Sequence, residues 1–184
     1  YASIYGDELD GVIFLGTGNQ PKAVVDSGLK LAHIAKLVRG ERYRSELLNT
    51  IMFGAYNKRI KDNRTANDWL TKDTKIVDEY LSDPKCSYKF TANAYIGFLN
   101  VIKYDIDKKN IAKTPDKLPV LFASGLEDPV GDYGKGVKKA FKMYTKYVDN
   151  VELYLYEDDR HELHSETDRE DIFSDLYEWI EENV

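Results

Sequence analysis

The sequence predicts an α/β fold in which parallel strands are flanked by helices and a helical cap is inserted after the first strand. Three short apolar runs have the length of buried strands: Val12–Leu15, residues 118–123 and Val151–Tyr156. Helical periodicity fills residues 21–104 and returns after each of the last two runs. Because strands that alternate with helices form right-handed crossovers, we expect the strands to be parallel.

The first strand is expected at Val12–Leu15, between Gly11 and Gly16. Its continuous apolar character is typical of a strand that is buried on both faces. Residues 1–5 resemble the tail of a helix, and Gly6 is expected to end it.

Four helices are predicted in the next segment, at residues 21–39, 45–56, 73–81 and 91–104. Pro21 suits a first helical position and Gly40 a helix end, and a polar loop is expected at residues 62–66. The first of these helices carries apolar or small residues along one expected stripe: Val24, Val25, Gly28, Leu31, Ala32, Ala35 and Val38.

A polar, proline-containing linker at residues 108–117 leads into the last part of the chain. There we expect a strand at 118–123, a helix over 137–148, a strand at Val151–Tyr156 and a final helix. Thr167 and Glu170 predict a capping box at the start of that helix, and its inward residues are expected to be Ile172, Phe173, Leu176 and Ile180, with Trp179 beside them. The predicted division is core strand and turn at 1–20, cap at 21–110, and C-terminal α/β core at 111–184.

The composition excludes several classes of function. The 184 residues carry a net charge of −6, which disfavours a nucleic-acid partner. Cys86 is the single cysteine, so an intramolecular disulfide is impossible and a thiolate zinc site is not expected. No apolar run reaches the roughly 18 residues of a transmembrane segment. We therefore expect a cytoplasmic protein.

Polar residues follow the second and third strands, where ligands bind in open parallel sheets. Glu127 and Asp128 come after the second strand, and His161 comes after the third. A carboxylate that accepts a hydrogen bond from one histidine nitrogen leaves the other nitrogen free to act as a general base. The order therefore indicates two members of a nucleophilic triad, although spacing alone does not choose between the two acids.

The third member, a nucleophile in a G-x-S-x-G elbow, is absent from the sequence. Ser27, Ser124 and Cys86 all lack the flanking glycines. Residues 16–18 (GTG) lack the third glycine of a dinucleotide loop, so we interpret them as a turn from the strand to the cap, and no cofactor is expected. His161 and His164 are three residues apart, but no third ligand has a defined place and no metal is expected.

Several segments resemble one branch of a known family. They are residues 1–13, 64–73 (RTANDWLTKD), 83–91 (DPKCSYKFT), 124–131 (SGLEDPVG) and 160–162 (RHE) followed by Glu166. The chain resembles the lysophospholipase, monoacylglycerol lipase and serine-aminopeptidase-like branch of the α/β-hydrolases, in its C-terminal part. The resemblance implies that Asp128 is the triad acid and His161 the base.

The resemblance implies a serine hydrolase that cleaves acyl esters, with its serine upstream of Tyr1. The implied partners are a hydrophobic acyl-ester molecule and either the missing N-terminal part of the fold or a second copy of the chain. The chain alone is expected to be inactive. Two alternatives stay open: a catalytically dead module for binding or self-assembly, and an epoxide or haloalkane hydrolase with an aspartate nucleophile.

Overall fold

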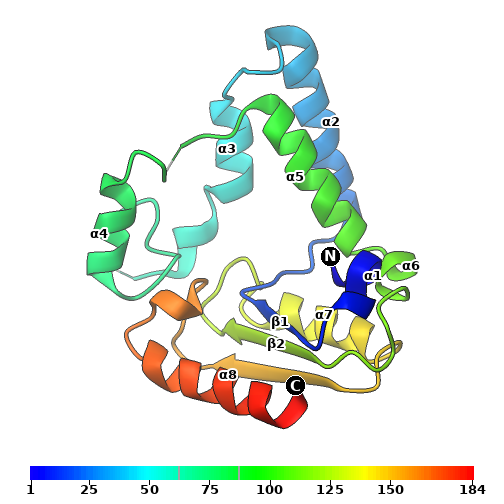
Figure 1. Ribbon diagram of the computed structural model, residues 1–184. Helices are drawn as coiled ribbons and strands as arrows, with labels where there is room; N and C mark the ends of the chain where they lie inside the picture. Colours follow the sequence, from blue (N-terminus) through cyan, green and yellow to red (C-terminus); the bar gives the residue numbers. More distant parts are fainter. Residues whose placement is uncertain (62, 87) are drawn as a thin grey trace.

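A three-stranded parallel sheet with helices on both faces supports a taller helical segment, as the computed structural model shows (Figure 1). The structure describes residues 1–61, 63–86 and 88–184. The elements, where η marks a 3-10 helix, are α1 (Ala2–Tyr5), η1 (Gly6–Glu8), β1 (Val12–Leu15), α2 (Lys22–Arg39), α3 (Glu46–Phe53), η2 (Tyr56–Arg59), α4 (Thr74–Ser82), α5 (Ala92–Asp105), α6 (Lys108–Ile111), β2 (Val120–Gly125), α7 (Lys135–Tyr144), β3 (Val151–Tyr156), η3 (Leu163–Ser165) and α8 (Arg169–Asn183).

The strands follow one another in the order β1-β2-β3. Val120 of β2 lies opposite Val12 on one side and Val151 on the other, and both pairings are parallel. Every residue of the central strand β2 is buried. The predicted α/β class and parallel strands are confirmed.

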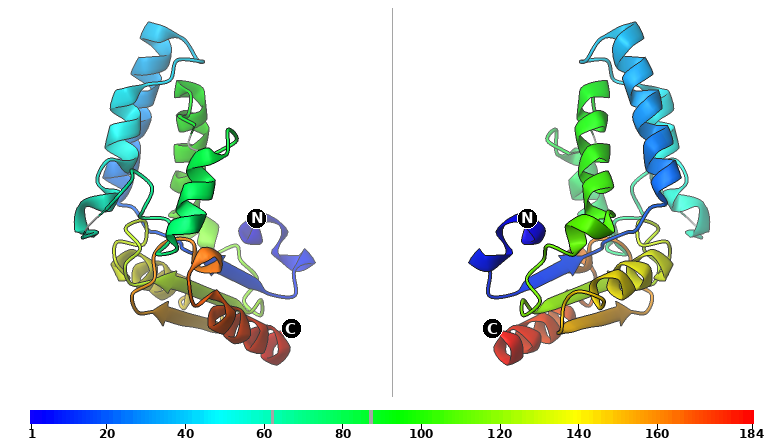
Figure 2. Two further views of the ribbon diagram at one scale, coloured as in Figure 1. Left: turned by 90° about the vertical axis from the view of Figure 1, so that its left-hand side faces the viewer. Right: turned by 90° about the vertical axis from the view of Figure 1, so that its right-hand side faces the viewer.

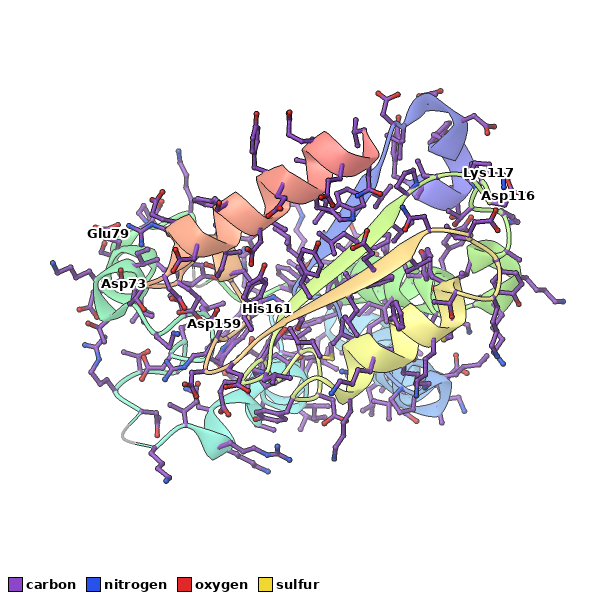
Figure 3. All side chains as sticks on the ribbon, turned by 90° about the horizontal axis from the view of Figure 1, so that it is seen from below. Asp73, Glu79, Asp116, Lys117, Asp159 and His161 are labelled. Atoms are coloured by element: carbon purple, nitrogen blue, oxygen red, sulfur yellow. The ribbon has the colours of Figure 1, made fainter. Side chains whose placement is uncertain are left out.

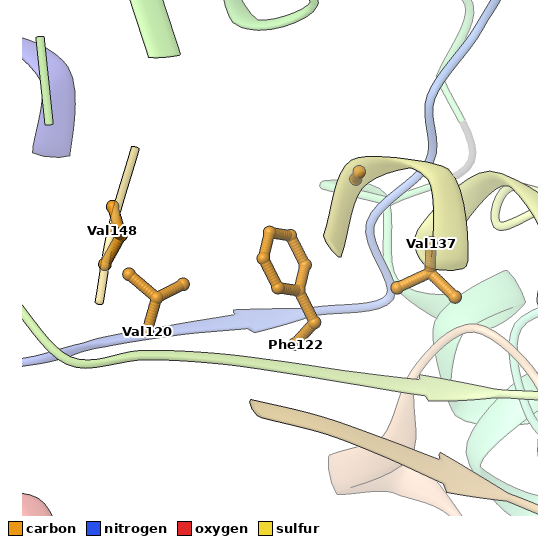
Figure 4. Close-up of a cluster of buried hydrophobic side chains, with 5 residues drawn as sticks. Val120, Phe122, Val137 and Val148 are labelled. Carbon is orange, nitrogen blue, oxygen red and sulfur yellow. The ribbon is translucent and has the colours of Figure 1, made fainter. Parts of the chain in front are cut away.

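Helices α7 and α8 cover opposite faces of the sheet (Figure 2). On the α7 face, Val120 and Phe122 of β2 pack with Val137 and Val148 (Figure 4). On the α8 face, Ile172 packs against Ala123 in a second cluster. Burial of these large aliphatic and aromatic side chains contributes most of the stability of such a layered fold.

The helical segment, which we define as residues 22–105 with α2 to α5, rises above the sheet (Figure 1). Its two long helices, α2 and α5, pack through Val25, Leu29 and Leu99. Three of its helices begin at residues whose side chains accept backbone N–H hydrogen bonds, as their sequence favours: Ser45, Asp73 and Thr91. Among the described residues, no helix combines the length and apolarity needed to cross a lipid bilayer.

Strand β1 departs from its prediction. The sequence favours burial on both faces, but Val12, Ile13 and Phe14 are half-buried and Leu15 is 41% exposed. The physical reason is position: β1 pairs only with β2 among the described residues, so it is an edge strand.

Several helix predictions are also corrected. In α2, Val24, Leu31 and Val38 of the predicted stripe are exposed, because the helix packs through the narrower face of Val25 and Leu29. The linker at 108–117 contains the one-turn helix α6. Helix α1 ends at Tyr5 with Gly6 as its C-cap, as predicted, but Gly6 has right-handed helical geometry and the chain continues directly into η1.

At the C-terminus, the predicted capping box does not form. Helix α8 begins at Arg169, and its N-cap residue Asp168 makes no side-chain capping bond. Phe173 and Ile180 are exposed, so Ile172 and Trp179 alone form the fully buried side of this helix. Two residues of predicted segments, Asp62 and Ser87, lie outside the described residues.

Candidate functional site

The loops that follow β2 and β3 meet at the carboxyl end of the sheet. The Glu127 backbone N–H donates to the Asp159 carbonyl over 2.8 Å. A Cβ atom on Gly125 would lie 2.1 Å from that same carbonyl oxygen, so the close approach requires glycine at this position. Figure 3 shows Asp159 and His161 close together, at the opposite end of the strands from Asp116 and Lys117.

Asp128 and His161 are in direct contact at this junction. The Asp128 side chain is fully buried, and its Oδ2 lies 3.1 Å from His161 Nδ1. Its other oxygen, Oδ1, accepts a hydrogen bond from the Val130 backbone N–H over 2.7 Å. With both oxygens engaged, the carboxylate orients the imidazole, and a proton on Nδ1 leaves Nε2 as the basic nitrogen.

The structure distinguishes between candidate site residues that sequence spacing could not tell apart. Glu127 is exposed beside the buried Asp128, so only Asp128 is paired with the histidine. His164 is exposed on η3. Ser124 is fully buried in β2, Ser27 is exposed on α2, and Cys86 follows α4, so none occupies a strand-to-helix elbow.

The end of β1 also touches the histidine. Gly16 has a φ of 59°, and a Cβ atom there would lie 2.6 Å from the His161 carbonyl oxygen and 2.9 Å from its Nδ1. Only glycine accommodates both the positive φ and the close contact. The sequence interpretation of residues 16–18 as a turn after the strand agrees with the structure but misses this contact.

Aromatic side chains of the helical segment pack beside His161. The Trp69 ring centroid lies 5.2 Å from that of His161, and the Tyr56 ring lies 4.9 Å from Trp69. Burial, together with the negative charge of Asp128, raises the pKa of Tyr56 to about 12, so its phenol stays neutral. A groove of about 420 Å³ lies next to these rings, lined in part by Tyr56, Val130 and Tyr133.

Three acids that flank His161 in the sequence, Asp159, Glu166 and Asp168, form a cluster with oxygens within 4.8 Å of one another. The Lys72 ammonium forms an ion pair with Asp159 and lies 3.6 Å from Asp168. Burial raises the pKa of Asp159, although the Lys72 charge acts against this rise. Because the lysine already supplies a cation to the cluster, the donor set fits an internal ion pair better than a metal ion.

A family model described as serine aminopeptidase, S33, matches residues 1–168. Among curated proteins no sequence match is found. The fold is similar to that of a highly thermostable carboxyl esterase from Bacillus coagulans in complex with glycerol, with a TM-score of 0.89, 24% identity and coverage of 100% of this chain and 60% of that one.

A lipase in its open form gives a TM-score of 0.82 and 27% identity, with 98% of this chain and 59% of that one covered. A soluble variant of monoglyceride lipase from Saccharomyces cerevisiae, in complex with a substrate analog, gives 0.69 and 21%, with 100% and 57% covered. The chain thus spans less than two thirds of the length of these structures. With the family model matched over most of its length, this chain belongs to the S33 serine aminopeptidase family of α/β-hydrolases.

Proposed function

We propose that this chain carries the acid and the base of a serine hydrolase that cleaves carboxylic esters of hydrophobic acyl groups, as lysophospholipases and monoacylglycerol lipases do. One observation carries the proposal: the buried Asp128 carboxylate contacts His161 Nδ1 over 3.1 Å at the carboxyl ends of neighbouring strands. In parallel α/β sheets this edge is where ligands bind.

In this reaction a serine from a segment preceding Tyr1 attacks the ester carbonyl. His161 Nε2 takes the serine proton and then donates it to the departing alcohol. Asp128 stabilises the imidazolium that forms between the two transfers and holds Nδ1 as a donor. Water then attacks the acyl-serine, with His161 serving again as base and acid.

The helical segment is proposed to act as the cap that covers the acyl chain. The rings of Trp69, Tyr56 and Phe53 pack against one another in a cluster that contacts His161 through Trp69. An apolar wall next to the reacting groups excludes water and accommodates an acyl group in preference to a charged one. This placement supports an acyl ester as the substrate class.

The test is an esterase assay with short- and long-chain p-nitrophenyl esters, on this chain and on the longest polypeptide product of its gene. In that product, His161→Ala should lower kcat by about 1,000-fold, the usual scale for losing a general base. His164→Ala is the matched control, because this exposed histidine lies in the same loop. Equal activity of the wild-type and His161→Ala proteins would refute the proposed role.

A second candidate function is a catalytically inactive module that self-associates. It is favoured by the exposure of apolar side chains around the unpaired edge of β1, including Leu15 and, on α1, Ile4 and Tyr5. Such an edge favours pairing with another chain. Sedimentation velocity tests this candidate, since a monomer at every concentration would contradict it. The esterase assay tests the first proposal separately, since a lack of activity in every gene product would contradict that one.

A further inference from the structure

Glu166 is a fully buried carboxylate, five residues after His161, whose two oxygens face different parts of the molecule. Its Oε1 accepts the Arg160 backbone N–H over 2.7 Å, immediately before His161 in the chain. Its Oε2 accepts the Thr71 hydroxyl over 3.0 Å and the Lys72 backbone N–H over 2.9 Å, both from the helical segment. One side chain therefore bridges the histidine loop and the helical segment.

Further hydrogen bonds join the same two segments, residues 68–72 and 160–166, which we call the histidine junction. The Arg160 guanidinium donates to the Asp68 and Thr71 carbonyls over 2.7 and 2.9 Å. The Glu162 backbone N–H donates to the Leu70 carbonyl over 2.7 Å. Because Asp128 restrains only the imidazole ring, the junction is what restrains the backbone that carries it.

Both side-chain oxygens of Glu166 must accept hydrogen bonds, one from the histidine loop and the other from the helical segment. Two backbone N–H groups converge on Glu166, together with the Thr71 hydroxyl, whose single proton is shared with the Ser165 carbonyl 2.8 Å away. An ionised carboxylate accepts without presenting a donor of its own. A glutamine would offer one oxygen and one NH₂ group, so it would place a donor against either Arg160 N–H or the Thr71 and Lys72 donors. A buried carboxylate is unfavourable for packing alone, and these bonds account for its presence.

We infer that Glu166 is a positioning residue: it fixes the backbone at His161 to residues 68–72 of the helical segment, so that the location of the base depends on that segment. The inference rests on the proposed function for its catalytic meaning. It assigns the helical segment a second part in catalysis, besides covering the acyl chain.

The test compares Glu166→Gln with Glu162→Gln as a matched control. Both substitutions remove one negative charge close to His161, but the Glu162 side chain accepts from the Ser165 hydroxyl, within the loop, and not from the helical segment as far as residues 1–61, 63–86 and 88–184 show. Thr71→Val provides a second route, because it retains the side-chain shape but removes the hydroxyl that joins residue 71 to Glu166 and to the Ser165 carbonyl, both in the histidine junction. It also removes the acceptor of the Asp73 backbone N–H, which lies outside the junction. Two readouts need no activity: amide hydrogen exchange at Glu162, and the ¹⁵N imidazole spectrum of His161.

We expect Glu166→Gln to speed exchange at the Glu162 amide about tenfold, since the Leu70 contact opens locally. The His161 Nδ1–H signal should broaden, and Thr71→Val should change both readouts in the same direction by a smaller factor. In the longest gene product, kcat should fall about 10- to 100-fold, the scale of a small misplacement of a catalytic group. The control should leave all three readouts near wild type.

A lower unfolding midpoint for Glu166→Gln, with exchange and imidazole signals equal to those of Glu162→Gln, would overturn the inference and leave Glu166 a structural residue. Should Glu166→Gln fail to fold, Thr71→Val decides the question by the same readouts. If no gene product hydrolyses esters, the proposed function fails, while the exchange and imidazole results still decide whether the junction positions His161.

Discussion

Replacing Gly16 by alanine tests whether the end of β1 shapes the site. The added Cβ would lie 2.6 Å from the His161 carbonyl oxygen and 2.9 Å from Nδ1, closer than real Cβ atoms approach other atoms. The carbonyl belongs to the restrained histidine junction and cannot simply rotate away. We therefore expect His161 to shift and its contact with Asp128 to be lost.

The magnitude follows from two contributions. An alanine at the positive φ of Gly16 is strained by about 1–2 kcal/mol. Loss of a hydrogen bond to the charged, buried Asp128 adds about 1.5–3 kcal/mol. Gly40→Ala is the matched control, because Gly40 also has a positive φ but no atom lies within 4 Å of its would-be Cβ. Its effect should be limited to backbone strain, about 1–3 kcal/mol.

The assay is urea unfolding of both variants together with the ¹⁵N imidazole spectrum. Gly16→Ala should reduce the free energy of unfolding by about 2.5–5 kcal/mol, the sum of the strain and the lost bond. It should also remove the His161 Nδ1–H signal, which Gly40→Ala should retain. The reasoning is refuted if the Gly16→Ala protein keeps that signal and loses no more stability than the control.

Three further predictions concern the acid, the buried carboxyl groups and the core. Asp128→Asn should lower kcat of the longest gene product by about 10,000-fold, because the amide favours the wrong imidazole tautomer; retention of the wild-type tautomer in the ¹⁵N spectrum would contradict this. Burial raises the pKa of Glu166 above 4.5 and that of Asp159 above 3.8, so the folded state holds these protons more tightly. Their contribution to stability is present at low pH and lost as pH rises through the raised pKa values. Between about pH 4 and about pH 7, the free energy of urea unfolding should therefore fall less for Glu166→Gln than for the wild type. An equal fall in the two proteins would contradict the assignment. Leu121→Ala, in the fully buried β2, should reduce the free energy of unfolding by about 2–5 kcal/mol, whereas Leu37→Ala, 86% exposed, should change it by about 0.5 kcal/mol or less.

Local patterns predict the strands and their parallel direction well. Val151–Tyr156 is found with its predicted bounds, and the second strand is shifted by two residues. Asp128 and His161 are predicted together because the carboxyl ends of parallel strands meet, and their contact in the structure follows from that geometry. Their catalytic roles, like the boundaries proposed for the cap, stay predictions.

The remaining features depend on contacts between distant segments, which no local pattern encodes. Trp69 reaches His161 from the helical segment, and Gly16 reaches it from the first strand. Glu166 is recognised in sequence only through the family resemblance, since its partners Thr71 and Lys72 lie about 95 residues earlier. The half-burial of β1 also depends on its neighbours and not on its own apolar residues.

The connection between the strands has a consequence for the order of folding. Val120 pairs with Val151, 31 residues later, but with Val12 only across 108 residues. Closing the longer loop costs about 1 kcal/mol more in chain entropy, and long-range pairing slows folding. The β2–α7–β3–α8 unit should therefore assemble first, with β1 added once the helical segment between them has shortened the distance. During synthesis, β1 leaves the ribosome long before β2, so its apolar face stays exposed while more than 100 further residues are made.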